Sequence, residues 1–125
     1  MTTPQTAKLI MTTSPLAVGS NADFNLVQVM SEWRNVRHIA ITEPSGKLVG
    51  IVSARDMLEH LSQADASHFI PISKLIKRAT VSATPETPLT ELANLMKQNN
   101  IGCVPIEEND KLVGMVSERD FLKLW

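Results

Sequence analysis

The chain has 125 residues, of which 43% are hydrophobic and 20% are charged, and its formal net charge is −1 at pH 7. The length suits one ordinary domain or two half-domains that share a core, and the composition is that of a globular protein. A net charge so close to zero provides no long-range attraction for a polyanion, which argues against general nucleic-acid binding.

Targeting signals and cysteine usage point to the cytoplasm. The N-terminus has no basic segment followed by an apolar run, so we expect no signal peptide. No apolar stretch approaches the roughly 20 residues that cross a bilayer. Cys103 is the only cysteine, which excludes an internal disulfide and favours a reducing compartment. The sequence therefore predicts a soluble cytoplasmic protein without membrane contact.

The first half of the chain, residues 1–62, predicts the order strand, helix, strand, strand, helix. Apolar residues at helical spacing predict a core-facing stripe on the first of these helices. The stripe consists of Leu26, Val29, Met30 and Trp33. Turn residues at 44–46 then separate strands over 36–41 and 47–52, and a second helix begins at about Ala54.

A polar stretch with Pro71 reads as a linker over 63–73, and residues 74–125 then predict the same order of elements. Pro88 suits the first turn of a helix. The apolar stripe that follows it consists of Leu89, Leu92, Ala93 and Met96. Asn109 and Asp110 form the turn between the last two strands, and a closing helix begins at about Glu118.

The two halves share one sequence. Residues 48–56 recur as residues 112–120 at a shift of 64, with differences only at Ile51/Met115 and Ala54/Glu118. Residues 36–41 match 101–106 at a shift of 65, and residues 8–10 match 74–76 at a shift of 66. Since the shift changes only between predicted elements, the pattern indicates that one supersecondary unit has been duplicated.

The most polar part of the repeat is Ser-x-Arg-Asp, at 53–56 and at 117–120. A serine followed three residues later by an acid, before an apolar run, has the form of a capping box, which is a purely structural role. Capping alone does not explain the glycine three residues before each serine, or the arginine beside each acid. Glycine in a strand often marks a close approach by another backbone or a ligand, and arginine at a helix N-terminus suits a phosphate. Capping with and without ligand binding both remain open.

In these residues the chain resembles a tandem pair of cystathionine-β-synthase (CBS) domains, also called a Bateman module. The family motif, Gly-apolar-apolar-Ser/Thr-x-x-Asp, is complete in both copies, and Val104-Pro105-Ile106 matches a second family feature. The resemblance extends from about Lys8 to Trp125. It implies an α/β (α+β) fold of two β-α-β-β-α repeats, packed about a pseudo-twofold axis with two clefts between them.

The resemblance implies a regulatory module that senses adenosine nucleotides (AMP, ADP or ATP, with Mg²⁺ on the phosphates), an energy sensor without enzymatic activity. S-adenosylmethionine and NAD are alternative ligands in the family. Many such modules form homodimers through their helices and signal to an effector protein. By the same resemblance, Asp56 and Asp120 would hold the ribose hydroxyls, Ser53 and Ser117 would cap the helices and face the ligand, and the arginines would neutralise phosphate.

The implied ligand-binding residues form two sets. Those of the second repeat are Thr80, Ser82, Cys103, Val104, Pro105, Ser117, Arg119 and Asp120. Those of the first repeat are Leu16, Val18, Arg37, His38, Ile39, Ser53, Arg55 and Asp56. The first repeat departs from the family pattern, because Ala40 replaces proline and the basic pair at 37–38 replaces Gly102 and Cys103. That pair either adds charge for phosphates or narrows the cleft, and we expect the second repeat to bind the ligand better.

Other functions are less well supported by the residues. The histidines show no metal-ligand spacing, and no catalytic motif is present. Cys103 is better explained as a small core residue than as a reactive thiol. The remaining alternatives are a structural module that only dimerises or docks, and nucleic-acid binding through Arg34, Arg37 and His38.

Overall fold

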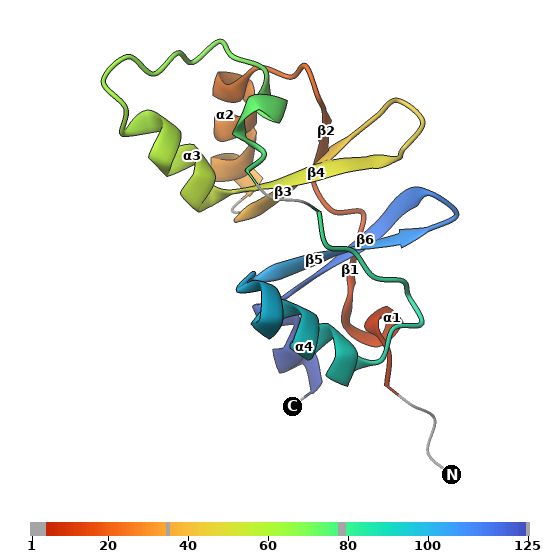
Figure 1. Cartoon of the computed structure of the whole chain (residues 1–125). Helices are drawn as coiled ribbons and strands as arrows, with labels where there is room; N and C mark the ends of the chain where they lie inside the picture. Colours follow the sequence, from red (N-terminus) through yellow and green to blue (C-terminus); the bar gives the residue numbers. More distant parts are fainter. Residues whose placement is uncertain (1–4, 35, 78–79, 125) are drawn as a thin grey trace. The chain divides into compact units, whose positions relative to one another are not determined.

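A computed structural model of the chain describes residues 5–34, 36–77 and 80–124, without the side chain of Trp33. It is a mixed α/β structure with two small sheets (Figure 1). The helices are α1 (Ala7–Ile10), α2 (Phe24–Arg34), α3 (Ala54–Leu61) and α4 (Leu89–Asn99), with 3₁₀ helices η1 (Ile72–Leu75) and η2 (Glu118–Leu124). The strands are β1 (Thr12–Thr13), β2 (Ala17–Gly19), β3 (His38–Thr42), β4 (Leu48–Ser53), β5 (Cys103–Glu108) and β6 (Lys111–Ser117).

Each repeat contributes the predicted hairpin to one sheet. In the first sheet, of order β2-β3-β4, β2 is parallel to β3 and β3 is antiparallel to β4. The second sheet, of order β1-β6-β5, is antiparallel throughout. Asn109 and Asp110, with φ of 53° and 60°, connect the paired residues Glu108 and Lys111. Positive φ at both central residues is the geometry of a two-residue type I′ hairpin, which asparagine and aspartate tolerate.

Contacts divide the chain into two compact units, which we call the 16–80 unit (Leu16–Thr80) and the 81–125 unit (Val81–Trp125 together with Met1–Pro15). These units differ from the sequence repeats at 1–62 and 74–125. The reason is that the N-terminal segment pairs with β6, where Thr12 lies opposite Met115, whereas η1 packs within the 16–80 unit. The N-terminal segment, which begins the first repeat, thus belongs to the unit with the strands of the second repeat. The segment that leads into the second repeat, with η1, belongs to the unit with the strands of the first repeat.

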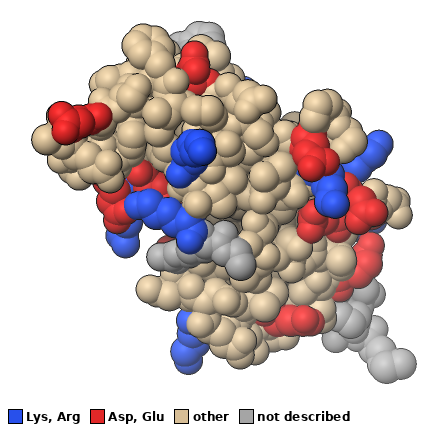
Figure 2. Space-filling model, turned by 45° about the horizontal axis from the view of Figure 1, so that its top comes forward, with Lys and Arg blue, Asp and Glu red and all other residues tan. Residues whose placement is uncertain are grey.

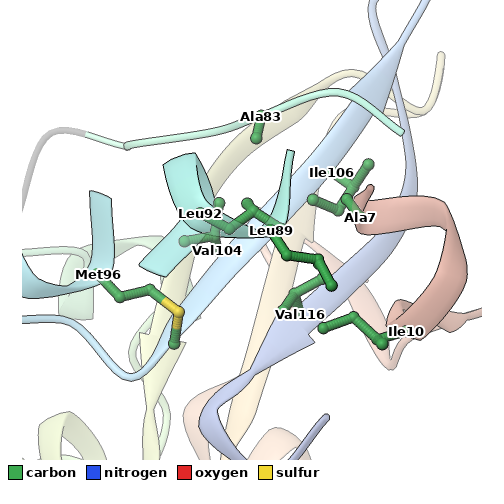
Figure 3. Packing of buried hydrophobic residues seen from close by; sticks show 9 residues of the cluster. All are labelled: Ala7, Ile10, Ala83, Leu89, Leu92, Met96, Val104, Ile106 and Val116. Carbon is green, nitrogen blue, oxygen red and sulfur yellow. The ribbon is translucent and has the colours of Figure 1, made fainter. Parts of the chain in front are cut away.

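The core of the 81–125 unit lies between α4, α1 and the β5–β6 hairpin (Figure 3). Its buried residues are Ala7, Ile10, Ala83, Leu89, Leu92, Met96, Val104, Ile106 and Val116. Three of the four residues predicted for the stripe on α4 are therefore in the core, and Ala93 is exposed. Ala7 and Ile10 are completely buried or nearly so, which makes the N-terminal segment an integral part of this core.

The core of the 16–80 unit corrects the stripe predicted on α2. Phe24 and Val27 are completely buried, whereas Leu26 and Val29 are 55% and 56% exposed. Met30 packs partly against the core, and the predicted contribution of Trp33 lies outside the described side chains. The helix carries apolar residues at i, i+3 spacing on two of its faces, so periodicity alone chose the wrong one.

Three further elements differ from the predictions. The polar segment 63–73 ends in the core, because Ile72 in η1 is completely buried. The first strand expected around 80–82 is reduced to one parallel bridge between Ala83 and Ile106. The closing helix of the second repeat is the 3₁₀ helix η2. Within the described ranges, no helix combines the length and the apolar character that a membrane span requires.

The glycine of each repeated motif lies against a chain segment from outside its own hairpin. An added Cβ on Gly50 would lie 2.8 Å from the side chain of Ile76. An added Cβ on Gly114 would lie 2.8 Å from Sδ of Met11 and 3.1 Å from the backbone oxygen of Thr12. The close approach that capping does not explain is therefore made by the chain itself.

We predict that Gly114→Ala lowers the free energy of unfolding by about 1–3 kcal/mol, because the new methyl group overpacks against a backbone oxygen that a side-chain rotation cannot move. The measurement is urea unfolding monitored by circular dichroism. Gly19→Ala is the matched control, since a Cβ there meets nothing within 4 Å. Equal stability of the two variants would contradict this role of the glycine.

Candidate functional site

The serine and aspartate of the first repeat form a complete capping box at the start of α3. The Asp56 amide donates to Ser53 Oγ at 3.1 Å, and the Ser53 amide donates to Asp56 Oδ2 at 2.8 Å. This confirms the predicted cap and fixes the carboxylate beside the end of β4. Among the described residues, no group donates to Asp56 Oδ1, so this half-buried carboxylate has acceptor positions left for a ligand.

The second repeat keeps only part of this arrangement. The Ser117 amide donates to Asp120 Oδ2 at 2.8 Å, and Ser117 Oγ is 3.3 Å from the same oxygen. The other oxygen, Oδ1, accepts from Lys123 Nζ at 2.8 Å and from Thr12 Oγ1 at 3.2 Å. Asp120 is only 7% exposed, and both of its oxygens are bonded to the protein. The same motif thus places its acid in two different environments.

The structure brings most of the first predicted set together. His38 lies opposite Ser53 in the β3–β4 ladder, and the Arg37 carbonyl accepts from the Ala54 amide at 2.7 Å. The Leu16 carbonyl accepts from the Ala40 amide at 3.0 Å. Val18 lies opposite Ile41, the residue after Ala40 in β3. These contacts link β2, β3 and the start of α3 along one edge of the 16–80 unit.

The second predicted set is divided. Cys103 lies opposite Ser117, and Pro105 accepts from the Ala83 amide at 3.1 Å, next to Ser82. Thr80, however, belongs to the 16–80 unit, where its hydroxyl is 3.4 Å from the Val49 carbonyl oxygen. Thr80 therefore belongs to the unit that contains the strands of the first repeat, and the other members of its predicted set belong to the 81–125 unit.

Several predicted residues are buried in the cores. Ile39, Val104 and Pro105 are completely buried, and the side chains of Ile39 and Val104 belong to the two hydrophobic cores. Such residues can offer a ligand only backbone groups or a short apolar wall. The exposed or half-buried side chains at the two motifs are those of Arg37, His38, Ser53, Arg55 and Asp56 in one repeat and Ser82, Ser117 and Arg119 in the other.

The charge around the two motifs also differs. In the first repeat, exposed Arg55 follows Ala54 at the start of α3, and exposed Arg37 is the residue whose carbonyl accepts from the Ala54 amide. In the second repeat, Glu118 replaces Ala54, and an added Cβ on Gly102 would lie 3.4 Å from Glu118 Oε1. An anionic group therefore meets two cations at the first motif, and one cation with one carboxylate at the second.

Cys103 is buried in the 81–125 unit. Burial in the apolar core, together with the nearby Asp120 carboxylate, raises the pKa of its thiol to about 12. A thiol with such a pKa stays protonated at neutral pH and is a poor nucleophile. This agrees with the structural role that the sequence favours.

An acidic pocket of about 440 Å³ lies elsewhere in the 81–125 unit. It is lined by Thr84, Pro85, Glu86, Glu107, Glu108, Asn109 and Asp110. Across the part of the chain that the structure describes, no group of three or more His, Cys, Asp and Glu side chains is arranged to hold a metal ion. On the face drawn in Figure 2, red and blue side chains are interspersed and no broad blue patch is present, unlike the face of a nucleic-acid-binding protein.

Sequence reasoning missed two residues at the second motif, Thr12 and Lys123. Both bond to Asp120, and Lys123 Nζ also donates to the Ile10 carbonyl at 2.9 Å. An alignment of the two repeats could have drawn attention to Lys123. The position that matches it across the 64-residue shift is Glu59, so the charge is reversed just where the motif is otherwise repeated.

The chain is similar to known proteins in both sequence and structure. The sequence model of the CBS domain matches residues 7–63 and 72–125. A homoserine O-acetyltransferase from Methanococcus vannielii is 25% identical over 86% of this chain, and the chain spans only 22% of that protein. The CBS domain pair of protein MJ0100, solved in complex with 5′-methylthioadenosine and S-adenosyl-L-methionine, is 26% identical with a TM-score of 0.87, covering 98% of this chain and 96% of that one.

A more distant structure, CBSX2 in complex with AMP, shares the fold at 16% identity with a TM-score of 0.84, covering 95% of this chain and 94% of that chain.

The burial of Cys103 predicts a thiol that reacts slowly. Because its pKa is raised to about 12, the thiolate fraction at pH 8 is far below that of the unfolded chain, and the buried sulfur is also shielded. We expect 5,5′-dithiobis(2-nitrobenzoate) at pH 8 to modify the native protein at least about 100-fold more slowly than the protein in guanidinium chloride. Comparable rates in the two conditions would show a reactive, accessible thiol instead.

Proposed function

The chain belongs to the CBS domain family, and from that premise we propose that it is a regulatory module that binds an adenosine-containing ligand and has no enzymatic activity of its own. The single observation that carries the proposal is the open oxygen of Asp56, held at the start of α3 by the capping box. The CBS pair of MJ0100, similar over nearly the whole chain, binds two ligands of this class.

The chemistry at Asp56 suits a ribose. A carboxylate oxygen with free lone pairs can accept hydrogen bonds from two vicinal hydroxyls. Ser53 Oγ lies beside it, and Arg55 and Arg37 supply positive charge for a phosphate or carboxylate on the ligand. Val18 of β2 and His38 of β3, which are both half-buried, offer a surface for the adenine.

We assign the better site to the first repeat, which reverses the order expected from the sequence. The sequence favoured the second repeat because of its proline and its small residues at 102–103. Two physical features support the reversal: the Asp120 carboxylate is already bonded through both oxygens, and Glu118 opposes an anionic ligand. Asp56 has an oxygen that accepts from no described group, and Ala54 stands where Glu118 stands in the second repeat. AMP, ADP, ATP and S-adenosylmethionine are the candidate ligands, with Mg²⁺ entering only on their phosphates.

We predict that Asp56→Asn weakens the binding of AMP or S-adenosylmethionine at least about 10-fold, because hydrogen bonds to an ionised carboxylate contribute about 1.5–3 kcal/mol each. Asparagine keeps an acceptor for the Ser53 amide, so the cap survives. Isothermal titration calorimetry gives the affinity.

The matched control is Asp65→Asn, which neutralises an exposed acid of the same unit that takes part in no described contact. For the wild type, a thermal-shift panel with AMP, ADP, ATP, NAD and S-adenosylmethionine, with and without Mg²⁺, identifies the ligand. A ligand at 100 times its Kd stabilises the folded state by about 2.7 kcal/mol. If none of these compounds stabilises the wild type, the proposed function is wrong.

A second candidate function is dimerisation or docking to an effector protein, and exposed apolar side chains support it. Leu26 and Val29 of α2, Leu58 of α3 and Phe69 are each more than half exposed, all within the 16–80 unit. Large apolar side chains exposed in this number often mark a protein–protein interface. We propose a second copy of the chain as the partner, in keeping with the dimers that the family resemblance implies.

We expect the wild type to sediment at twice the 13.8 kDa mass of the monomer. Leu26→Asp with Val29→Asp on α2 should give the monomer, because two charges on one helix face cannot be buried in an apolar interface. Analytical ultracentrifugation at several concentrations provides the measurement. The paired substitution Asn25→Asp with Gln28→Asp, on the same helix, is the control for added charge. A monomeric wild type would contradict this proposal.

A further inference from the structure

We infer that Lys123, together with Thr12, selects which of the two repeated carboxylates accepts the ligand. Both residues hold Asp120 on the N-terminal segment, so that Asp56 alone binds a ribose and the chain takes one ligand. This inference rests on the proposed function and adds the residues that choose between its two sites.

The hydrogen-bond acceptor positions of the Asp120 carboxylate are already occupied by donors from the protein. A carboxylate offers about four acceptor positions. Oδ1 accepts from Lys123 Nζ at 2.8 Å and from Thr12 Oγ1 at 3.2 Å. Oδ2 accepts from the Ser117 amide at 2.8 Å, with Ser117 Oγ at 3.3 Å. A ribose diol would have to replace at least two of these donors at a side chain that is 7% exposed.

The two donors to Asp120 Oδ1, Lys123 and Thr12, are themselves held by further contacts. Lys123 Nζ also donates to the Ile10 carbonyl at 2.9 Å, and Thr12 lies in β1, paired with Met115 of β6. Ile10 is almost completely buried in the core. Opening Asp120 therefore breaks contacts that hold the N-terminal segment, and a ligand would have to compensate for that loss.

The charge of the side chain three residues after the motif acid is reversed in the first repeat. Glu59 stands where Lys123 stands in the second repeat, three residues after the motif acid in both cases. A glutamate cannot pair with Asp56. It forms an ion pair with Lys77 instead, on the segment that leads into the second repeat. One lysine-to-glutamate difference thus leaves one acid open and closes the other.

The test uses 5′-methylthioadenosine, which carries a ribose and no charge at neutral pH, so that an added lysine cannot attract it through a phosphate. We expect calorimetry to give one molecule bound per chain in the wild type. Glu59→Lys should weaken this binding about fivefold or more, because a lysine three residues after Asp56 competes for its open oxygen as Lys123 does for Asp120.

Glu59→Gln is the matched control, since it removes the same ion pair with Lys77 without placing a cation beside Asp56. We expect its affinity to stay within about twofold of the wild type. Asp120→Asn should also keep one bound molecule with affinity in that range, while its Tm falls by several degrees because the N-terminal segment loses its anchor.

Three outcomes overturn the inference and leave the proposed function intact: two molecules bound per chain, loss of binding in Asp120→Asn with retention in Asp56→Asn, or equal affinities in Glu59→Lys and Glu59→Gln. A wild type that binds no adenosine compound defeats the proposed function itself. The anchoring role of Lys123 is then judged from Tm alone. Lys123→Met should lower the Tm more in the wild type than in Asp120→Asn, where only the bond to the Ile10 carbonyl is left to lose, and additive effects would refute the anchor.

Discussion

The close approach of a leading segment to a glycine in the middle of the closing strand is the constraint on which both units depend. At Gly114 the approaching atoms are Met11 Sδ and the Thr12 carbonyl oxygen, and at Gly50 they belong to Ile76. A side chain at position 114 would press on the Thr12 backbone oxygen and push the segment away from the strand, and one at position 50 would displace the Ile76 side chain. Because these segments belong to opposite repeats, each compact unit is completed by residues from the far side of the linker. The duplication is therefore interlocked, and neither repeat contains a complete unit.

Interlocking also explains why identical motifs behave differently. A motif fixes only the side chains within it, whereas the environment of its acid depends on the segment that crosses over. At Asp120 that segment supplies the Thr12 hydroxyl and the Ile10 carbonyl that anchors Lys123. At Asp56 the segment carries Lys77, which pairs with Glu59 and not with the motif acid. The charge three residues after the acid decides whether its open oxygen is neutralised from within the protein.

Much of the fold could be predicted from the sequence because the repeat fixes the order of elements and the turns fix the hairpins. The cap at Ser53 and the stripe on α4 followed from local chemistry that tertiary contacts did not override. The buried face of α2 could not be predicted in this way. Apolar residues recur at helical spacing on two of its faces, and only packing in the folded unit buries Phe24 and Val27. Thr12 was missed and Thr80 was misplaced for a similar reason, because contacts across 108 and 31 residues of sequence leave no trace in the local pattern.

A complete family motif is thus weaker evidence for ligand binding than it looks. In both repeats the serine amide donates to one oxygen of the acid, and this bond helps to stabilise the start of the helix. Such a structural need is sufficient to maintain serine and aspartate in both copies. Ribose binding needs the other oxygen as well, and that oxygen is governed by positions outside the motif. On our proposal, residues outside the motif, such as Glu59 and Lys123, decide whether a copy binds a ribose or only caps its helix.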